Sequence, residues 1–135
     1  MIEVTEKFLD ENTNIMFVFG DNLSRMGKGG AAKLRHHPQS WGFITKKYPS
    51  NKDSSFYEVE EYKPIFKAEM ELLKAKLMET EHTHTWLISP VGSGLANKYH
   101  IWEEIIKPEM DKELILFPNA IRLWRTHQLP TDLLS

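Results

Sequence analysis

The amino-acid sequence predicts an α/β fold with a mostly parallel or mixed sheet and helices on both of its faces. Short continuous apolar runs recur along the chain, and stretches with helical spacing separate them. Glycine, proline and asparagine residues mark the boundaries between these segments. Strands that alternate with helices need crossover connections, which favour parallel pairing. The 135 residues show no internal repeat and no linker-like segment, so we expect a single domain over residues 1–135.

The predicted strands are short runs of apolar residues. Residues 15–19 (IMFVF) form the first run, which ends at Gly20 and suits a strand that is buried on both faces. The other runs are residues 41–45, 86–91 and 114–117, and residues 121–124 are a candidate for one further strand. In sheets of this kind ligands bind at the carboxyl ends of the strands, so the segments that follow the strands are where we expect a site.

Helices are expected between these strands. Residues 31–35 can open one after the first strand, and residues 101–106 form a later one that ends near Pro108. A long helix is expected after Ser55 and Glu58, which have the spacing of a capping box. Its apolar residues recur at alternating steps of four and three, as one face of a helix requires: Phe66, Met70, Leu73 and Leu77.

Composition argues against several classes of function. The chain has no cysteine, which excludes disulfides, thiolate metal sites and a cysteine nucleophile, and we expect a cytoplasmic protein. The formal charge is −2, so no global positive field favours nucleic acid. We expect no membrane partner, because no apolar run is long enough to span a bilayer. No cofactor or metal is expected, since no histidine has another ligand at a spacing typical of zinc sites.

Two glycine-rich loops follow predicted strands. The first glycine loop runs from Met26 to Ala32 (MGKGGAA), and the second runs from Gly92 to Ala96 (GSGLA). Residues without bulky side chains let backbone N–H groups approach an anion closely, and a following helix adds the positive end of its dipole, about 0.3–2 kcal/mol for a bound charge. Each loop alone is also typical of an ordinary strand-to-helix turn. Two such loops side by side predict a site for a pyrophosphate.

The first loop does not have the spacing of the common nucleotide-binding motifs. A P-loop needs serine or threonine after its lysine, but Lys28 is followed by Gly29. The glycine that precedes Gly27 is Gly20, which is too far away for that motif. Gly27, Gly29 and Ala32 fit the looser dinucleotide fingerprint, yet that motif follows its strand directly, whereas residues 21–26 intervene in this chain.

Three blocks of the sequence resemble, in order, the signature blocks of macrodomains. They are residues 25–31 (RMGKGGA), 44–47 (ITKK) and 90–96 (PVGSGLA), with Trp102 and Glu103 downstream. The chain looks most similar to the branch of terminal ADP-ribose protein glycohydrolases, and the resemblance extends over about residues 2–124. It implies a three-layer α/β/α macrodomain-like sandwich with a mixed central sheet, and an ADP-ribose diphosphate between the two glycine loops.

The resemblance also implies a set of site residues. In that branch the first lysine of the ITKK block attacks the anomeric carbon of the distal ribose, and the matching residue is Lys46. An amine with a lowered pKa can form a Schiff base with an opened ribose, and the neighbouring charge of Lys47 would lower the pKa of Lys46. Two lysines at the end of a strand are also typical of solvated charges. The implied ligand-binding residues are Gly20, Asn22, Met26, Gly27, Lys28, Gly29, Gly30, Ala31, Thr45, Pro90, Gly92, Ser93, Gly94, Leu95, Ala96 and Tyr99.

The chain departs from the pattern of that branch at three places. Ala96 stands where the branch carries the aspartate that assists the lysine. Lys7 stands roughly where the family's adenine-reading aspartate lies, and Glu6 is a candidate substitute. The gap between Ala96 and Trp102 is longer than in the family by two residues and contains Tyr99.

The sequence leaves two functions open. Asp21 follows the first apolar run and is our candidate for the missing acid, although an aspartate after a strand is also typical of a turn. One function is hydrolysis of an ADP-ribosyl linkage through Lys46, assisted by Asp21. The other is a non-catalytic receptor or sponge for an ADP-ribose-derived signalling nucleotide, as would suit a small phage or bacterial protein. The expected partner is an ADP-ribose-type nucleotide or an ADP-ribosylated macromolecule.

Overall fold

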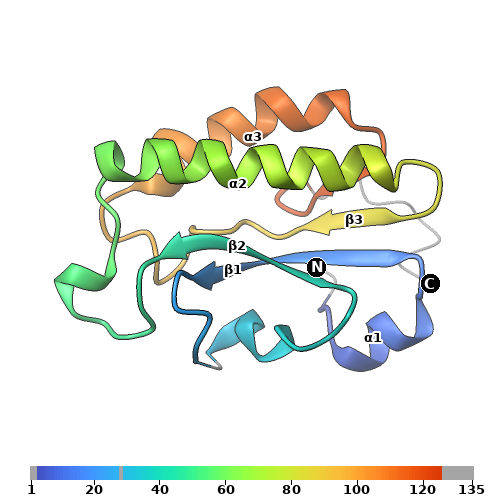
Figure 1. Cartoon of the computed structure of the whole chain (residues 1–135), viewed down its shortest axis with the longest axis horizontal. Coiled ribbons are helices and arrows are strands. Elements are labelled where there is room, and N and C mark those ends of the chain that lie inside the picture. The colour runs from blue at the N-terminus through green and yellow to red at the C-terminus, as the bar shows by residue number, and fades with distance from the viewer. Residues whose placement is uncertain (1–2, 28, 126–135) are drawn as a thin grey trace.

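A parallel four-stranded sheet forms the centre of the computed structural model, which describes residues 3–27 and 29–125 (Figure 1). The strand order is β2-β1-β3-β4, and each neighbouring pair of strands is parallel. The expectation of a mixed sheet is therefore wrong for the described residues, while the α/β class is confirmed. The strands are β1 (Ile15–Asn22), β2 (Ser40–Lys46), β3 (Thr85–Ile88) and β4 (Ala120–Arg122).

One predicted strand is wrong and one is confirmed near the C-terminal end of the described residues. Residues 114–117 do not form a strand, because Leu114–Leu116 is a 3-10 turn, η4, that continues a helix. Only Leu114 of that turn is buried, whereas Ile115 and Leu116 are 69% and 78% exposed. The further strand expected at 121–124 is β4, which begins one residue earlier and ends at Arg122.

Helices cover both faces of the sheet (Figure 1). One face carries α2 (Val59–Glu79) and α3 (Lys107–Glu113), and the other carries α1 (Glu6–Glu11) and the 3-10 helix η1 (Gly30–Leu34). The sequence pattern did not predict α1. The predicted helix after the first glycine loop is only the five-residue η1, so a long helix dipole does not point at that loop.

The remaining helical segments differ from the predictions in detail. A capping box does start α2, but it joins Glu58 and Glu61 rather than Ser55 and Glu58. Ser55 instead ends the 3-10 helix η2 (Asp53–Ser55). The later helix begins as the π-helix η3 (Trp102–Ile106) and passes through Pro108 into α3, since a proline fits the first turn of an α-helix.

Two apolar clusters hold these layers together. The alternating side chains of β1 separate them: Val18 packs towards α2 and α3, while Phe17 and Phe19 pack towards α1 and η1. The predicted apolar face of α2 is confirmed, because its four residues are all buried in the first cluster: Phe66, Met70, Leu73 and Leu77. Within the described residues, no helix combines the length and the apolar character needed to cross a bilayer.

The carboxyl ends of β1 and β3 are the point where the chain changes direction across the sheet. These two strands are neighbours. The chain leaves β1 towards the face with η1 and leaves β3 towards the face with α3 (Figure 1). Loops that diverge in this way open a crevice between adjacent strands, and open α/β sheets bind their ligands in such crevices.

Candidate functional site

Both glycine loops line one open cavity of about 410 Å³ at the carboxyl ends of β1, β2 and β3. The predicted site residues that line it are Gly20, Asp21, Asn22, Met26, Gly27, Gly29, Ala31, Thr45, Lys46, Pro90, Gly92, Gly94, Leu95 and Ala96. The structure therefore brings together segments from three separate parts of the chain. A volume of this size lies within the range of about 300–1,000 Å³ that small-molecule sites occupy.

A few predicted ligand-binding residues do not line the cavity. Ser93 is exposed, and its hydroxyl donates to the carbonyl oxygen of Pro90 at 2.6 Å. Tyr99 does not line the cavity either, and the Lys98 ammonium lies 5.8 Å from the centroid of the Tyr99 ring. Lys28 lies outside the described residues, and for Gly30 only the backbone, in η1, is described.

Four lining residues were not among the implied ligand-binding residues: Ala32, Pro49, Ser89 and Val91. Ala32 ends the first glycine loop and Val91 lies in the 90–96 block, while Ser89 directly precedes that block, so position along the chain was their signal. Pro49 belongs to the turn after β2 and reaches the first loop, because a Cβ on Gly27 would lie 3.1 Å from the Pro49 Cβ. Only the folded chain shows this contact.

The second glycine loop presents backbone donors without acceptors. Among the described residues, the N–H groups of Gly92, Gly94, Leu95 and Ala96 have no hydrogen-bond partner. Gly92 and Ala96 are buried, and an unpaired buried N–H costs free energy unless a ligand or water accepts its proton. Successive N–H groups in a turn form a concavity that binds anions. The loop therefore has the chemistry of a phosphate site.

Glycines at the base of the two loops allow the strands and loops to approach closely. A Cβ on Gly20 would lie 3.3 Å from the Thr45 hydroxyl and 3.7 Å from the Gly92 nitrogen. Gly92 has a positive φ of 82°, and a Cβ there would lie 2.5 Å from Cδ1 of Ile106 in η3. Larger residues at these two positions would push the second loop away from the sheet.

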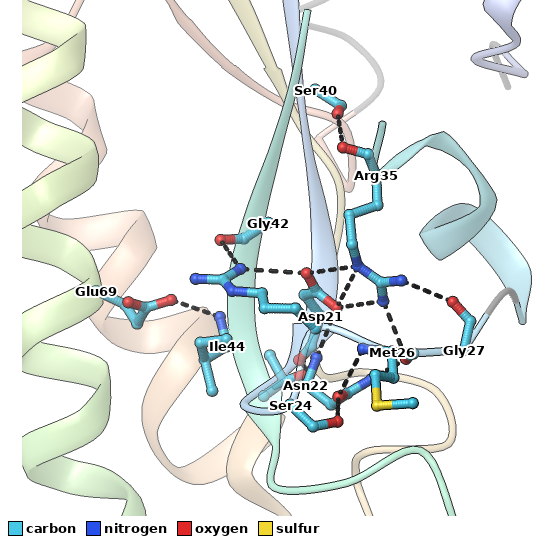
Figure 2. A network of polar contacts seen from close by, with 12 residues as sticks. Asp21, Asn22, Ser24, Met26, Gly27, Arg35, Ser40, Gly42, Ile44 and Glu69 are labelled. Carbon is cyan, nitrogen blue, oxygen red and sulfur yellow. Dashed lines mark hydrogen bonds and ion pairs between the residues drawn. The ribbon is translucent and has the colours of Figure 1, made fainter. Parts of the chain in front are cut away.

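A buried polar network lies behind the first glycine loop (Figure 2). Its centre is the Asp21 side chain, which is 0% exposed. Arg35 donates to the Asp21 carboxylate from Nη2 at 2.5 Å and from Nε at 3.1 Å. Arg25 donates to the same carboxylate at 3.1 Å, and the Asn22 backbone N–H donates at 2.8 Å. Gly42 leaves the space for this group, because a Cβ there would lie 2.6 Å from both Asp21 and Arg25.

Asn22 and Arg35 connect this network to the loop itself. The Asn22 amide donates to the Met26 carbonyl oxygen at 2.6 Å and accepts from the Ser24 hydroxyl at 2.5 Å. Arg35 donates to the Met26 carbonyl at 3.1 Å and to the Gly27 carbonyl at 2.7 Å. The first loop is therefore held by polar groups that come from β1 and from the residue after η1.

Asp21 has no free oxygen for acid-base chemistry. Burial alone would raise its pKa, but the hydrogen bonds from Arg35, Asn22 and Arg25 outweigh burial and lower the pKa. A carboxylate held in its charged form by two guanidinium groups is a weak proton acceptor, and its buried side chain is not presented to a ligand. The geometry gives Asp21 the task of organising Arg35 and Arg25. Its predicted catalytic role stays a prediction that these contacts do not favour.

Lys46 does reach the cavity. Its ammonium lies 4.7 Å from the centroid of the Phe56 ring and donates to the Ser50 carbonyl oxygen at 3.1 Å. Burial lowers the pKa of Lys46. Lys47 does not contribute to this shift, because its ammonium forms an ion pair with Glu61 at 2.8 Å, which raises the pKa of Lys47. The expected effect of one lysine on the other is therefore absent from the described contacts.

The N-terminal candidates for adenine recognition lie elsewhere. The Glu6 carboxylate lies 2.7 Å from Nε2 of His36, and the Lys7 ammonium lies 3.9 Å from the Glu11 carboxylate on the exposed side of α1. Neither Glu6 nor Lys7 lines the cavity. Across residues 3–27 and 29–125, no group of three histidine or acidic side chains is arranged to hold a metal ion.

Comparisons with known proteins give one match. No curated protein and no solved structure matches the sequence. A family model described as a family of unknown function, DUF7831, matches residues 2–98. This range contains β1, β2, β3 and both glycine loops, and it ends before η3. The chain belongs to the DUF7831 family.

Proposed function

We propose that the cavity binds the diphosphate of ADP-ribose or of a related ADP-ribose-derived nucleotide, in a macrodomain-like three-layer α/β/α sandwich. The observation that carries this proposal is the set of N–H groups in the second loop without a partner among the described residues, at Gly92, Gly94, Leu95 and Ala96, four residues that line the same cavity as the first loop. Diphosphates are bound by such groups at the carboxyl ends of parallel strands. The helices and sheet described above supply the layers that a sandwich of this kind requires.

The rim of the cavity suits the apolar parts of a nucleotide. Met26 on the first loop is 63% exposed, and Leu95 on the second loop is 81% exposed. Both residues line the cavity. Large exposed apolar side chains on two facing loops are typical of a ligand-binding groove, in which apolar walls surround a few polar groups. We assign these two side chains to contacts with the base or the ribose rings.

Gly94 offers the sharpest test of binding. A Cβ at this position would meet no atom within 4 Å, so Gly94→Val keeps the fold and fills ligand space instead. We expect the affinity for ADP-ribose, measured by calorimetry, to fall by at least about tenfold, which is 1.4 kcal/mol. Ser93→Thr is the matched control, because threonine has the shape of valine, lies one residue away and outside the cavity, and keeps the hydroxyl that donates to the Pro90 carbonyl.

That experiment has three informative outcomes. If wild-type protein binds neither ADP-ribose, NAD nor inorganic pyrophosphate, the proposed function is wrong. If it binds them and both variants bind equally well, the ligand occupies another part of the molecule. Loss in Gly94→Val alone supports the cavity as the site.

Hydrolysis of an ADP-ribosyl linkage is the second candidate function. Lys46 favours it, because this residue lines the cavity and burial lowers the pKa of its amine. Ala96 and the fully engaged Asp21 favour a receptor without turnover instead. Incubation with ADP-ribosylated protein and nucleic acid distinguishes the two functions. An enzyme loses turnover in Lys46→Met and keeps it in Lys47→Met, whereas a receptor shows no turnover in the wild-type protein.

A further inference from the structure

Arg35 contacts the backbone of the first glycine loop in a way that sets the direction of its peptide groups. The Arg35 guanidinium donates from Nη2 to the Met26 carbonyl and from Nη1 to the Gly27 carbonyl, at 3.1 and 2.7 Å (Figure 2). The Asn22 side-chain amide donates to the same Met26 carbonyl at 2.6 Å. Two consecutive carbonyl oxygens of the loop therefore point to the network behind it.

The geometry of the peptide bond fixes the direction of the Gly27 N–H group once the direction of the Met26 carbonyl is known. In a trans peptide the C=O and N–H groups point in opposite directions. When the carbonyl of Met26 faces Arg35, the N–H of Gly27 faces away from Arg35. Gly27 lines the cavity, and its N–H has no hydrogen-bond acceptor among the described residues. The positive φ of 90° at Gly27 permits this arrangement without strain.

Asp21 fixes the guanidinium that orders the loop. Arg35 presents Nε and Nη2 to the carboxylate and Nη1 and Nη2 to the loop, so one planar group connects the two. The backbone of Arg35 is itself anchored, because its N–H donates to Ala32 and its carbonyl accepts from the Ser40 hydroxyl at 3.2 Å. Arg25 also holds the carboxylate, but its other contact is the Gly42 carbonyl in β2 and not the loop.

We infer that Arg35, held by Asp21, is a positioning residue for the anion site: it turns the carbonyl groups of the first loop away from the cavity and thereby aims the Gly27 N–H at a ligand phosphate. This inference rests on the proposed function and adds how the first loop takes part in it. Arg35 itself does not touch the ligand. The second loop does not depend on it, since the side-chain hydrogen bonds of Arg35 among the described residues reach only Asp21, Met26 and Gly27.

The test compares Arg35→Lys with Arg25→Lys. A lysine keeps a positive charge beside Asp21, but one ammonium lacks the planar fork that reaches the carboxylate and two carbonyls together. Arg25→Lys makes the same change at the same carboxylate without removing a loop contact. We expect Arg35→Lys to weaken the binding of inorganic pyrophosphate by about tenfold, the effect of one lost charge-assisted contact, and Arg25→Lys to change it by less than about threefold.

Amide resonances show whether the effect is confined to the first loop. In wild-type protein, pyrophosphate should shift the Gly27 amide together with those of Gly92 and Gly94. In Arg35→Lys the shift of Gly27 should be lost while those of Gly92 and Gly94 remain, a pattern that general loss of structure does not produce. Equal weakening in both lysine variants, or none in Arg35→Lys, overturns the inference. Failure of wild-type protein to bind pyrophosphate or ADP-ribose instead overturns the proposed function.

A measurement on wild-type protein keeps the inference testable if Arg35→Lys does not fold. The side-chain N–H resonances of Arg35 should stay in place when pyrophosphate is added, while the Gly27 amide shifts. If the Arg35 resonances shift and the Gly27 amide does not, Arg35 binds the anion directly and the positioning role is wrong.

Discussion

The two glycine loops line the same cavity but are held in place by different interactions. The first loop is fixed by a charged network, in which Asp21, Arg35 and Asn22 contact its backbone or one another. The base of the second loop is constrained by shape, because a Cβ on Gly92 would meet Ile106, Thr45 and Ile101. One wall of the cavity should therefore respond to charge and pH, and the other should respond to side-chain volume.

The largest effect is expected when the network of the first loop loses a charge. Arg35→Met leaves the buried Asp21 carboxylate with Arg25 as its remaining cationic partner, and breaking a buried pair in this way costs about 3–5 kcal/mol. Urea denaturation measures the change in the free energy of unfolding. Lys33→Met, on the exposed side of η1, should change it by less than about 0.5 kcal/mol. Equal values for both variants would contradict the role of the network.

A methyl group at the base of the second loop should have the next largest effect. Gly92→Ala combines a positive φ of 82° with a close contact to Ile106, and we expect a loss of about 2 kcal/mol. Ile106→Val removes the Cδ1 atom that the new Cβ meets. The substitution should therefore lower the free energy of unfolding less in the Gly92→Ala variant than in the wild-type protein. A double-mutant cycle from urea denaturation checks this coupling. Simple additivity would show that the packing contact does not hold the loop.

Acid should weaken the charged network that holds the first loop. The folded-state pKa of Asp21 lies below its unfolded value of about 3.9, so its contribution to stability is complete above that pH and is lost as the pH falls through the folded pKa. Each unit between the two pKa values is worth about 1.4 kcal/mol. Asp21→Asn should remove this part of the pH dependence below about pH 4. An unchanged slope in that variant would assign the acid sensitivity to other carboxylates.

The smallest effect is expected at the tip of the first loop. A Cβ on Gly29 would meet no atom within 4 Å, and its φ is not in the left-handed region. Gly29→Ala should therefore change the free energy of unfolding by less than about 0.5 kcal/mol and can even raise it, because alanine restricts the unfolded chain. A loss as large as that of Gly92→Ala would mean that the tip is packed as tightly as the base.

Much of the fold could be predicted because buried strands leave continuous apolar runs. The run at 15–19 lies within β1, the run at 41–45 lies within β2, and the run at 86–91 overlaps β3. Residues 114–117 gave the same signal but form the end of a helix, since a short apolar run has no period that separates a strand from a helical turn. The helix α1 was missed because it is only six residues long and buries only Leu9.

The position of the two glycine loops in the candidate site could be predicted from the sequence. The side-chain contacts that hold the first loop could not. Glycine loops that follow parallel strands must meet at one edge of the sheet, so the shared cavity could be expected. The partner of Asp21 could not, because Arg35 lies 14 residues away and no sequence pattern relates the two. The contact gives Asp21 a structural task, and the acid-base role that its position suggested stays a prediction. The sequence likewise did not show that Lys47 would pair with Glu61.

The parallel sheet has a consequence for how the cavity forms in time. The residues that pair between β1 and β3 lie far apart in the chain. For example, the Ser89 hydroxyl donates to the Val18 carbonyl, and the two residues are separated by 71 positions. Contacts of such long range form late and slowly, because the intervening chain must first be closed into a loop. The two walls of the cavity therefore meet only when β3 docks beside β1. A ligand that bridges them binds the finished fold alone, and its binding energy adds directly to the stability of that last step.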